Sequence, residues 1–308
     1  MPDHRLPRHV LPRHYTLELA PDLSAHTFTG TVAIDVEVVE ATDQIILNAA
    51  DLVIEAASIL VGGERRHVSV SADESAERLV LTVEDRLQPG TARLEMAFTG
   101  ELNDRLHGFY RSTYQTPEGE KRTLATTQFE ATDARRAFPC WDDPAVKATF
   151  QVTLIIPSDS VAISNTLVES ETPQDGSTKA VRFAETPRMS TYLLAFVVGD
   201  LASVEDTAPG GTRMRVWATR GTEELGRFAR AVVVWCQEES ENMGGWTFID
   251  RRLENLMVEL KMPALRPRYV GRPASAAPAT GLMKRHLQEQ KALVEDALTL
   301  PAKQKARI

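Results

Sequence analysis

The stretch TTQFEATDARRAFPCWDDP, from Thr126 to Pro144, holds a glutamine, a glutamate, further charged residues, two prolines and one of only two cysteines in the chain. It has neither a helical nor a strand period, so we expect an irregular, turn-rich segment. The thiol of Cys140 could attack a substrate only if a base activated it, and no histidine lies nearby in the sequence. We therefore interpret Pro139, Cys140 and Trp141 as packing residues.

The charged residues of the same stretch have a structural interpretation as well. We expect Asp133, Arg135, Asp142 and Asp143 to form loop ion pairs and turn caps. The remaining polar pair is the Gln-x-Glu element at 128–130, which taken alone is typical of solvated surface. The stretch by itself therefore predicts no chemistry, and its meaning depends on the elements around it.

Those elements are predicted to be β-strands. In Thr31–Val38 the even-numbered residues are apolar and the odd-numbered ones are mostly polar, which is typical of a half-buried strand. Similar patterns cover 79–83, 94–98 and 150–156, and the Gln-Pro-Gly turn at 88–90 predicts a hairpin or meander. Residues 192–198 are apolar on both faces, which indicates a central strand covered on both sides.

The last third of the chain has a helical pattern instead. Apolar residues with a period near 3.6 predict helices over 222–233, 249–260 and 283–298, and Thr222 and Thr280 are suited to cap the first and the third. We therefore predict a mainly β protein, with a large antiparallel, saddle-like β domain over 1–220 and a small helical or α/β segment over 221–308.

Composition excludes several functional classes. The 308 residues carry a net charge of −8, which argues against binding to nucleic acid. No apolar run reaches about 18 residues, so no membrane-spanning helix is expected. Two cysteines are too few for a disulfide framework, and no apolar segment follows the basic N-terminal stretch, so we expect a cytoplasmic protein. His4, His9 and His14 are five residues apart among prolines, a spacing that disfavours a metal site.

The order of these motifs resembles the N-terminal domain of the zinc-dependent aminopeptidase N family over about residues 5–231. The resemblance implies a β domain of which one edge closes the active site, with Gln128 and Glu130 meeting the free amino terminus of a peptide. A fixed carboxylate supplies a charge-assisted hydrogen bond to an α-ammonium group, which explains why an exopeptidase needs such a residue. The segments that carry the resemblance are RLPRHVLPRHYTLELAPDL, HGFYRSTY, the stretch 126–144, AISNT, TPRMSTYLLAFVVGDL and RVWATRGTEELGRFA.

The chemistry of that family requires an HExxH helix, in which two histidines hold zinc and the glutamate activates water. The 308 residues contain no HExxH, and SENMGG at 240–245 is only a superficial echo of the family's GAMEN strand. We therefore predict neither catalytic residues nor metal ligands here, and no aminopeptidase turnover by this chain alone.

The tail has a different resemblance, over about residues 231–300. VVWCQEESENMGGWTFIDRRLENL and the segment containing YVGRPASAAPATG resemble the C-terminal end of the thiamine-diphosphate component of 2-oxoglutarate dehydrogenase. The diphosphate-binding GDG motif is absent, so this resemblance does not imply thiamine diphosphate. The two resemblances meet near Ala231, where we expect a helix ending near Arg230 and an extended piece after it. Such a join suggests a fused or rearranged reading frame, or a constructed chimera.

Two functional hypotheses follow. In the first, the chain is an incomplete aminopeptidase-like protein that binds peptide amino termini weakly through Gln128 and Glu130. In the second, it is a non-enzymatic interaction or oligomerisation module, whose C-terminal helices dock on a protein partner or on a second copy. Neither hypothesis involves nucleic acid or a membrane.

Overall fold

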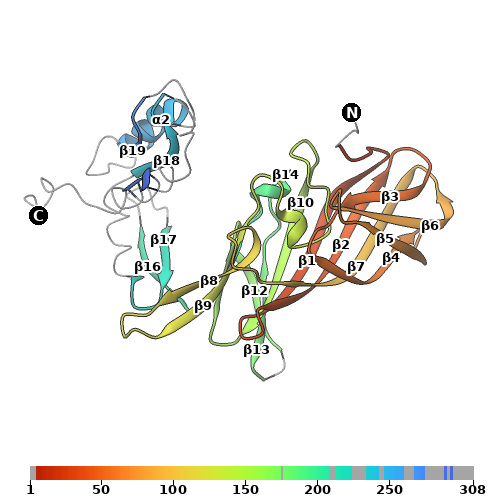
Figure 1. The fold of residues 1–308 in the computed structure, drawn as a ribbon, viewed down its shortest axis with the longest axis horizontal. Helices are drawn as coiled ribbons and strands as arrows, with labels where there is room; N and C mark the ends of the chain where they lie inside the picture. The colour runs from red at the N-terminus through yellow and green to blue at the C-terminus, as the bar shows by residue number, and fades with distance from the viewer. Residues whose placement is uncertain are drawn as a thin grey trace, which may run out of the picture. The chain divides into compact units, whose positions relative to one another are not determined.

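The chain forms two compact units, Met1–Leu201 and Ala202–Ile308, which are described separately (Figure 1). The computed structural model describes residues 5–174, 176–207, 213–223, 234–242, 246–259, 267–274, 288–289 and 292–293. The domain boundary near residue 220 stays a prediction.

The first unit is built around one eleven-stranded sheet, which confirms the mainly β fold class. Its neighbouring strands are antiparallel, except that β1 and β10 run parallel along 14–19 and 149–154. The strand order is β12-β13-β10-β1-β2-β7-β4-β5-β6-β3, with β14 added beside β10. The bounds are β1 Val10–Asp22, β2 Thr27–Val38, β3 Thr42–Asn48, β4 Leu52–Val61, β5 Glu64–Asp73, β6 Arg78–Leu87, β7 Gly90–Glu101, β10 Lys147–Pro157, β12 Val168–Pro173, β13 Thr178–Phe183 and β14 Met189–Ser190.

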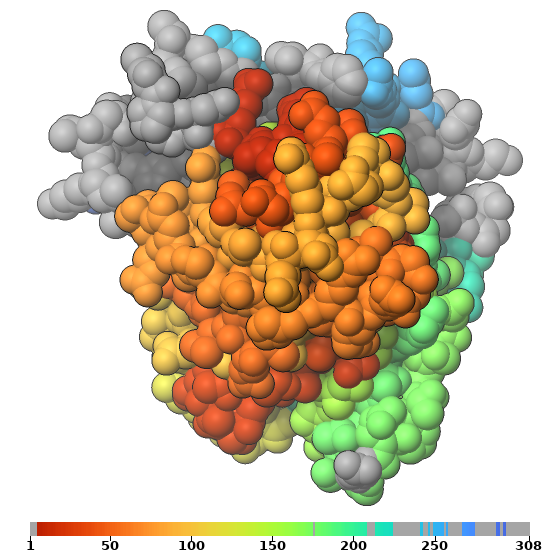
Figure 2. Space-filling view, turned by 90° about the vertical axis from the view of Figure 1, so that its right-hand side faces the viewer, coloured from red at the N-terminus to blue at the C-terminus, as the bar shows by residue number. Residues whose placement is uncertain are grey.

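The strand β5 bends the large sheet. Its first residues, 64–67, pair with β4, and its later residues, 68–73, pair with β6. The strands on both sides of this bend bury their apolar faces in a single hydrophobic core. The predicted inward face of β2 is confirmed, because Val32, Ile34, Val36 and Val38 are all buried. Figure 2 looks at this end of the unit, where side chains of the segment from β4 to β6, in orange, cover the surface.

The predicted hairpin across the Gln-Pro-Gly turn at 88–90 is wrong. Both strands exist, but β6 pairs with β5 and β3, whereas β7 pairs with β2 and β4. The turn therefore carries the chain from the end of the sheet to its centre. The physical reason is that β2 and β4 occupy both edges of β7, so β6 has no edge left to join.

A smaller four-stranded sheet carries the stretch of interest. Its order is β11-β15-β9-β8, formed by Val161–Ser164, Phe196–Gly199, Lys121–Gln128 and Gly108–Gln115. Two short 3-10 turns, η1 (Ala134–Arg136) and η2 (Thr191–Leu193), lie in the described part of the unit.

The predicted strand over 192–198 is only partly correct. The run begins in η2, only its later part forms the strand β15, and Leu193 is 47% exposed. The side chain of Asn165 explains the break, because its Nδ2 donates to the Leu193 carbonyl at 2.8 Å and its Oδ1 accepts the Ala195 N–H at 2.8 Å. The apolar sequence did not reveal this local competition from an amide side chain.

In its described residues, the second unit has two small sheets and the helix α2, with further helical residues at 288–289 and 292–293. β16 (Leu201–Thr207) pairs with β17 (Arg213–Thr219), and β18 (Val234–Ser240) runs parallel to β19 (Arg268–Arg272). The helix α2, Trp246–Glu259, confirms the helix predicted over 249–260, and β18 is the extended piece expected after Arg230. The helix predicted over 222–233 lies outside the described residues apart from 222–223, and so does most of the third, of which 288–289 and 292–293 are helical.

Candidate functional site

The polar stretch begins as a tight turn at the end of β9. Gln128 is the last residue of that strand, and the N–H of Asp133 donates to the carbonyl of Phe129 at 2.9 Å, which closes the turn. Phe129 is buried, and its ring meets Phe138 and Phe196 edge to face at centroid distances of 6.1 and 5.9 Å. These ring contacts anchor the turn to the hydrophobic core.

The predicted binding residues, Gln128 and Glu130, flank that buried ring and are both exposed. Nε2 of Gln128 donates to the Glu130 backbone carbonyl at 3.4 Å, an arrangement that leaves the side-chain oxygen of Gln128 as an acceptor. Among the described residues, nothing forms an ion pair or a hydrogen bond with the carboxylate of Glu130. The turn therefore presents two adjacent acceptors, one of them charged, to solvent.

The residues after the turn form a dense ion-pair network. Arg135 lies 3.0 Å from both Glu77 Oε2 and Asp142 Oδ2, and the Asp142 side chain is only 1% exposed. Thr191 Oγ1 donates to the other Asp142 oxygen at 2.9 Å. The predicted ion-pair role of Arg135 and Asp142 is thus confirmed, and this network holds the stretch against the β-sheet core.

The other acidic residues of the stretch are also structural, as predicted. Asp133 Oδ1 accepts from Arg136 Nε at 2.9 Å, and Arg136 reaches Asp51 with a second nitrogen. Asp143 Oδ1 accepts the N–H of Ala145 at 2.9 Å, which caps a turn. In this stretch Glu130 is therefore unlike Asp133 and Asp143, whose carboxylates already have protein partners.

Cys140 is a packing residue and not an exposed nucleophile. Pro139, Cys140 and Trp141 are all buried, as expected from the sequence. Burial, and then the neighbouring Asp142 charge, raise the pKa of the Cys140 thiol well above its ordinary value, so the thiol stays protonated near neutral pH. Burial likewise raises the pKa of Tyr15. The hydroxyl oxygen of Tyr15 accepts a hydrogen bond from the backbone N–H of Trp141 at 3.2 Å.

The described residues do not fit a zinc site. No group of three or more His, Cys, Asp or Glu side chains among them is arranged to hold a metal ion. His9 Nε2 pairs with the Gln44 carbonyl at 3.0 Å and His14 Nδ1 with Thr149 Oγ1 at 2.7 Å, so these two histidines face different partners. Within the described residues, no helix is long and apolar enough to cross a membrane.

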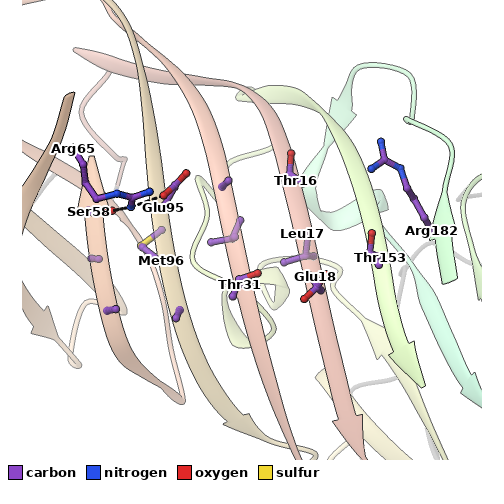
Figure 3. A pocket seen from close by; sticks show the side chains of 15 residues that line it. Thr16, Leu17, Glu18, Thr31, Ser58, Arg65, Glu95, Met96, Thr153 and Arg182 are labelled. Carbon is purple, nitrogen blue, oxygen red and sulfur yellow. Dashed lines mark hydrogen bonds and ion pairs between the residues drawn. The ribbon is translucent and has the colours of Figure 1, made fainter. Parts of the chain in front are cut away.

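One groove of the first unit lies elsewhere, on the outer face of the large sheet (Figure 3). It has a volume of about 570 Å³ and is lined by short side chains such as Thr16 and Thr31, with charged residues at its rim. Three of the charged lining residues are paired, Arg65 with Glu95 at 2.6 Å and Arg182 with Glu169 at 2.9 Å, and Glu18 adds a single exposed carboxylate. One exposed carboxylate is not a convergent set of polar groups, so the functional site is not placed in this groove.

The sequence analysis did not predict that three residues from other loops would lie around the turn. Glu77 and Asp51 pair with the arginines of η1, and His107 lies beside Asp133. Asp51 and Glu77 adopt positive φ angles of 56° and 50°, a conformation that Asp adopts more readily than Glu. No local spacing connects them to the stretch, because Asp51 and Glu77 lie in connections before β4 and before β6.

The fold and the polar stretch match a known family. The family model described as the Peptidase M1 N-terminal domain matches residues 11–193, which is more than half of the chain. The chain belongs to the peptidase M1 N-terminal domain family. Its relatives include Aminopeptidase M1 of Arabidopsis thaliana (47% identical over 230 residues) and Puromycin-sensitive aminopeptidase of Caenorhabditis elegans (42% over 235 residues).

This M1 N-terminal domain makes up most of the chain but little of those relatives. The two matches cover 73% and 75% of this chain, and only 26% and 25% of the relatives, so the chain spans about a quarter of their length. Aminopeptidase N of Acetobacter pasteurianus is 40% identical over 225 residues, which are 73% of this chain and 62% of that protein.

The tail is similar to a second family. The model described as 2-oxoglutarate dehydrogenase C-terminal matches residues 218–298. This match is short, and it covers the part of the chain that contains β18, α2 and β19.

Proposed function

We propose that this chain recognises the free amino terminus of peptides through the turn that carries Gln128 and Glu130. The carboxylate of Glu130 accepts hydrogen bonds from the α-ammonium group, and the side-chain oxygen of Gln128 accepts another. The observation that carries the proposal is the unpartnered, exposed carboxylate of Glu130 on a turn anchored by the buried Phe129. The names of the relatives, all aminopeptidases, agree with an amine-binding role.

We further propose that the chain binds peptides without hydrolysing them. Its 308 residues contain no HExxH, so they offer no helix that could hold zinc and activate water by the mechanism of the family. Binding to this face alone is weak, because the face is open and contacts only the end of a peptide.

Replacing the carboxylate of Glu130 by an amide tests the binding role. The variant Glu130→Gln keeps the size of the side chain but removes its charge, and we expect it to weaken the binding of a peptide with a free amine by about tenfold. Binding is measured by NMR titration of the full chain. The mass of the recovered peptide is then measured by mass spectrometry to detect any cleavage.

Glu118→Gln is the matched control. Glu118 is an exposed residue in the connection from β8 to β9, at the opposite end of that hairpin, and its substitution changes net charge by the same amount. The proposal predicts unchanged binding in this variant. Equal weakening in both variants would show that only general charge matters, and release of free amino acids would disprove the absence of hydrolysis.

The tail supports a second candidate function, which we propose as an interaction or oligomerisation module. Residues 218–298 match the dehydrogenase C-terminal model, and β18 and β19 form a parallel pair connected through α2. Two parallel strands are a small part of the sheets in which such units occur, so a partner could extend them. Sedimentation equilibrium over a concentration series tests this function: a mass that stays monomeric throughout contradicts self-association.

A further inference from the structure

An exposed leucine lies on the β8 side of the turn that carries Glu130. Gly108 pairs with Gln128 across the β8–β9 ladder, at the end of the small sheet where the turn begins. Leu106 lies two residues before this pair, and Glu130 lies two residues after it. Two residues span at most about 7 Å and paired strands lie about 5 Å apart, so the Cα atoms of Leu106 and Glu130 are no more than about 20 Å apart.

A second exposed leucine has the equivalent position on the β15 side of the turn. The antiparallel register of β15 and β9 joins Val197 to Thr126. Extended by two residues, this register sets Ala195 beside Gln128, and Leu193 lies two residues before Ala195. The same bound of about 20 Å therefore separates Leu193 from the glutamate of the turn.

Both leucines present apolar surface to solvent. Leu106 is 64% exposed and Leu193 is 47% exposed. A single exposed leucine is ordinary on a protein surface. Here two of them, which we call the flanking leucines, stand on either side of a turn whose Glu130 carboxylate has no partner among the described residues. The end of the small sheet thus combines one charged acceptor with apolar surface on both sides.

The backbone of Leu106 is held in a conformation that leucine rarely adopts. Its φ angle is 61°, in the left-handed region that is unfavourable for a bulky residue and easier for asparagine. The side chain of Asn103 fixes the loop, because its Nδ2 donates to the His107 carbonyl at 3.0 Å and its Oδ1 accepts the Arg105 N–H at 2.8 Å. An exposed leucine gains little from burial there, so this backbone outlier motivates a hypothesis of function.

We propose that the flanking leucines contact an apolar side chain of the peptide whose amino terminus is held at Glu130. The inference rests on the proposed function, and it names the substrate class as peptides with a large apolar residue near the free amine. An extended peptide advances about 3.3 Å per residue, so about six residues cover the largest separation. Contact between apolar side chains removes both from water, which strengthens binding.

A leucine scan of the peptide tests this contact. The probes are one short polar peptide with a free amine, and copies of it with a single leucine at each of about the first six positions. Their Kd values are measured by NMR titration of the full chain. In the wild type, we expect one or more leucine positions to strengthen binding about threefold or more over the polar peptide.

Two substitutions connect that gain to the flanking leucines. In Leu106→Asn and in Leu193→Asn we expect a smaller gain than in the wild type, and in the double variant no gain. The absence of a gain at every leucine position in the wild type would overturn the inference. A gain that persists in the double variant, or that is unchanged in either single variant, would overturn it as well.

A matched control and a stability measurement accompany these variants. Val39 is 45% exposed and follows β2, at the opposite end of that strand from Thr27, which pairs with Glu101 just before the loop of Leu106. Val39→Asn should leave the gain unchanged, and an equal loss in this variant would contradict a local contact. The urea midpoint of Leu106→Asn should be no lower than that of the wild type, because asparagine suits the left-handed backbone. If it is lower, Leu193→Asn decides the test.

Acetylated copies of the same peptides separate this inference from the proposed function. If the leucine gain follows the flanking leucines but binding is indifferent to acetylation and to Glu130→Gln, the proposed function fails and the apolar contact stands. If binding requires the free amine and Glu130 but no leucine position strengthens it, the inference alone fails.

Discussion

Two neighbouring carboxylates show how the surroundings of a side chain decide what it does. The Asp142 side chain is only 1% exposed and meets Arg135 and Thr191, whereas Asp143 is partly exposed and caps a turn through Ala145. A buried charge that loses its partner is far more unfavourable than an exposed turn without its cap. The two residues should therefore differ strongly in their effect on stability.

We predict that Asp142→Ala lowers the free energy of unfolding by about 3 kcal/mol or more, because it leaves the largely buried Arg135 without one of its partners. Asp143→Ala, the matched control, should lower it by only about 1 kcal/mol. Urea denaturation monitored by tryptophan fluorescence gives both values. Equal losses would contradict the view that the ion-pair network anchors the polar stretch.

Cys140 gives a prediction about alkaline pH. Burial raises the pKa of its thiol in the folded chain, so above about pH 8.5 the thiol ionises in the unfolded chain first. The stability that this group contributes is therefore complete below that pH and is lost as the pH rises, at up to about 1.4 kcal/mol per pH unit.

The measurement compares wild type and Cys140→Ala by urea unfolding between about pH 8 and pH 10, below the range in which Tyr15 would add its own effect. We expect the wild-type unfolding free energy to fall more steeply with pH than that of the variant. The comparison uses the slope of the unfolding free energy against pH and not its absolute value, because the alanine also leaves a small cavity that lowers the stability at every pH. Parallel curves would mean that the thiol is not protonated and enclosed as described.

At the residue scale, the sequence was sufficient where partners are local. The packing role of Cys140 and Trp141 and the ion-pair role of Arg135 with Asp142 follow from a stretch of nineteen residues, and the structure confirms them. The partners Glu77 and His107 could not be predicted, because they come from loops whose positions depend on the whole sheet. The binding role of Gln128 and Glu130 stays a prediction.

At the scale of elements, β2 and β7 are matched by two reciprocal glycine–phenylalanine pairs. Phe28 lies opposite Gly100, and Gly30 lies opposite Phe98 in the antiparallel register. A Cβ built at Gly30 would lie 2.6 Å from two ring atoms of Phe98, and one at Gly100 would lie 2.4 Å from the Phe28 ring. Each ring thus occupies the space above a glycine on the neighbouring strand, and only glycine leaves that space free.

We predict that Gly30→Ala lowers the free energy of unfolding by about 1–3 kcal/mol, because the added methyl group displaces the Phe98 ring. Combining it with Phe98→Leu should cost less than the sum of the two single changes, since the smaller side chain makes room for the methyl group. Unfolding of the four proteins of this cycle in urea measures the coupling. Strict additivity would contradict the contact between the two positions.

Elements were easier to predict than their pairing. Alternating apolar residues predicted β2, β6, β7 and β10 because each strand has one buried face. Nothing in that pattern says which strands are neighbours, which is why the hairpin of β6 with β7 was wrong. The strand over 192–198 was predicted too long for a related reason, because the amide of Asn165 binds the backbone and breaks the run.

At the scale of the whole molecule, the chain joins two parts with different relatives. The first unit belongs to the peptidase M1 N-terminal domain family, and residues 218–298 are similar to the 2-oxoglutarate dehydrogenase C-terminal family. The sequence predicted both resemblances and the mainly β architecture. The helices predicted over 222–233 and 283–298 lie almost wholly outside the described residues and stay predictions.

The account depends most on recognition of a free amine by this chain. The most direct measurement is the Kd of the wild-type chain for one short peptide and for the same peptide with its amino terminus acetylated, determined side by side by NMR titration. Acetylation removes the positive charge and the hydrogen-bond donors that Glu130 would bind, so we predict binding weaker by about tenfold or more for the acetylated peptide. Equal Kd values for the two peptides would contradict the account.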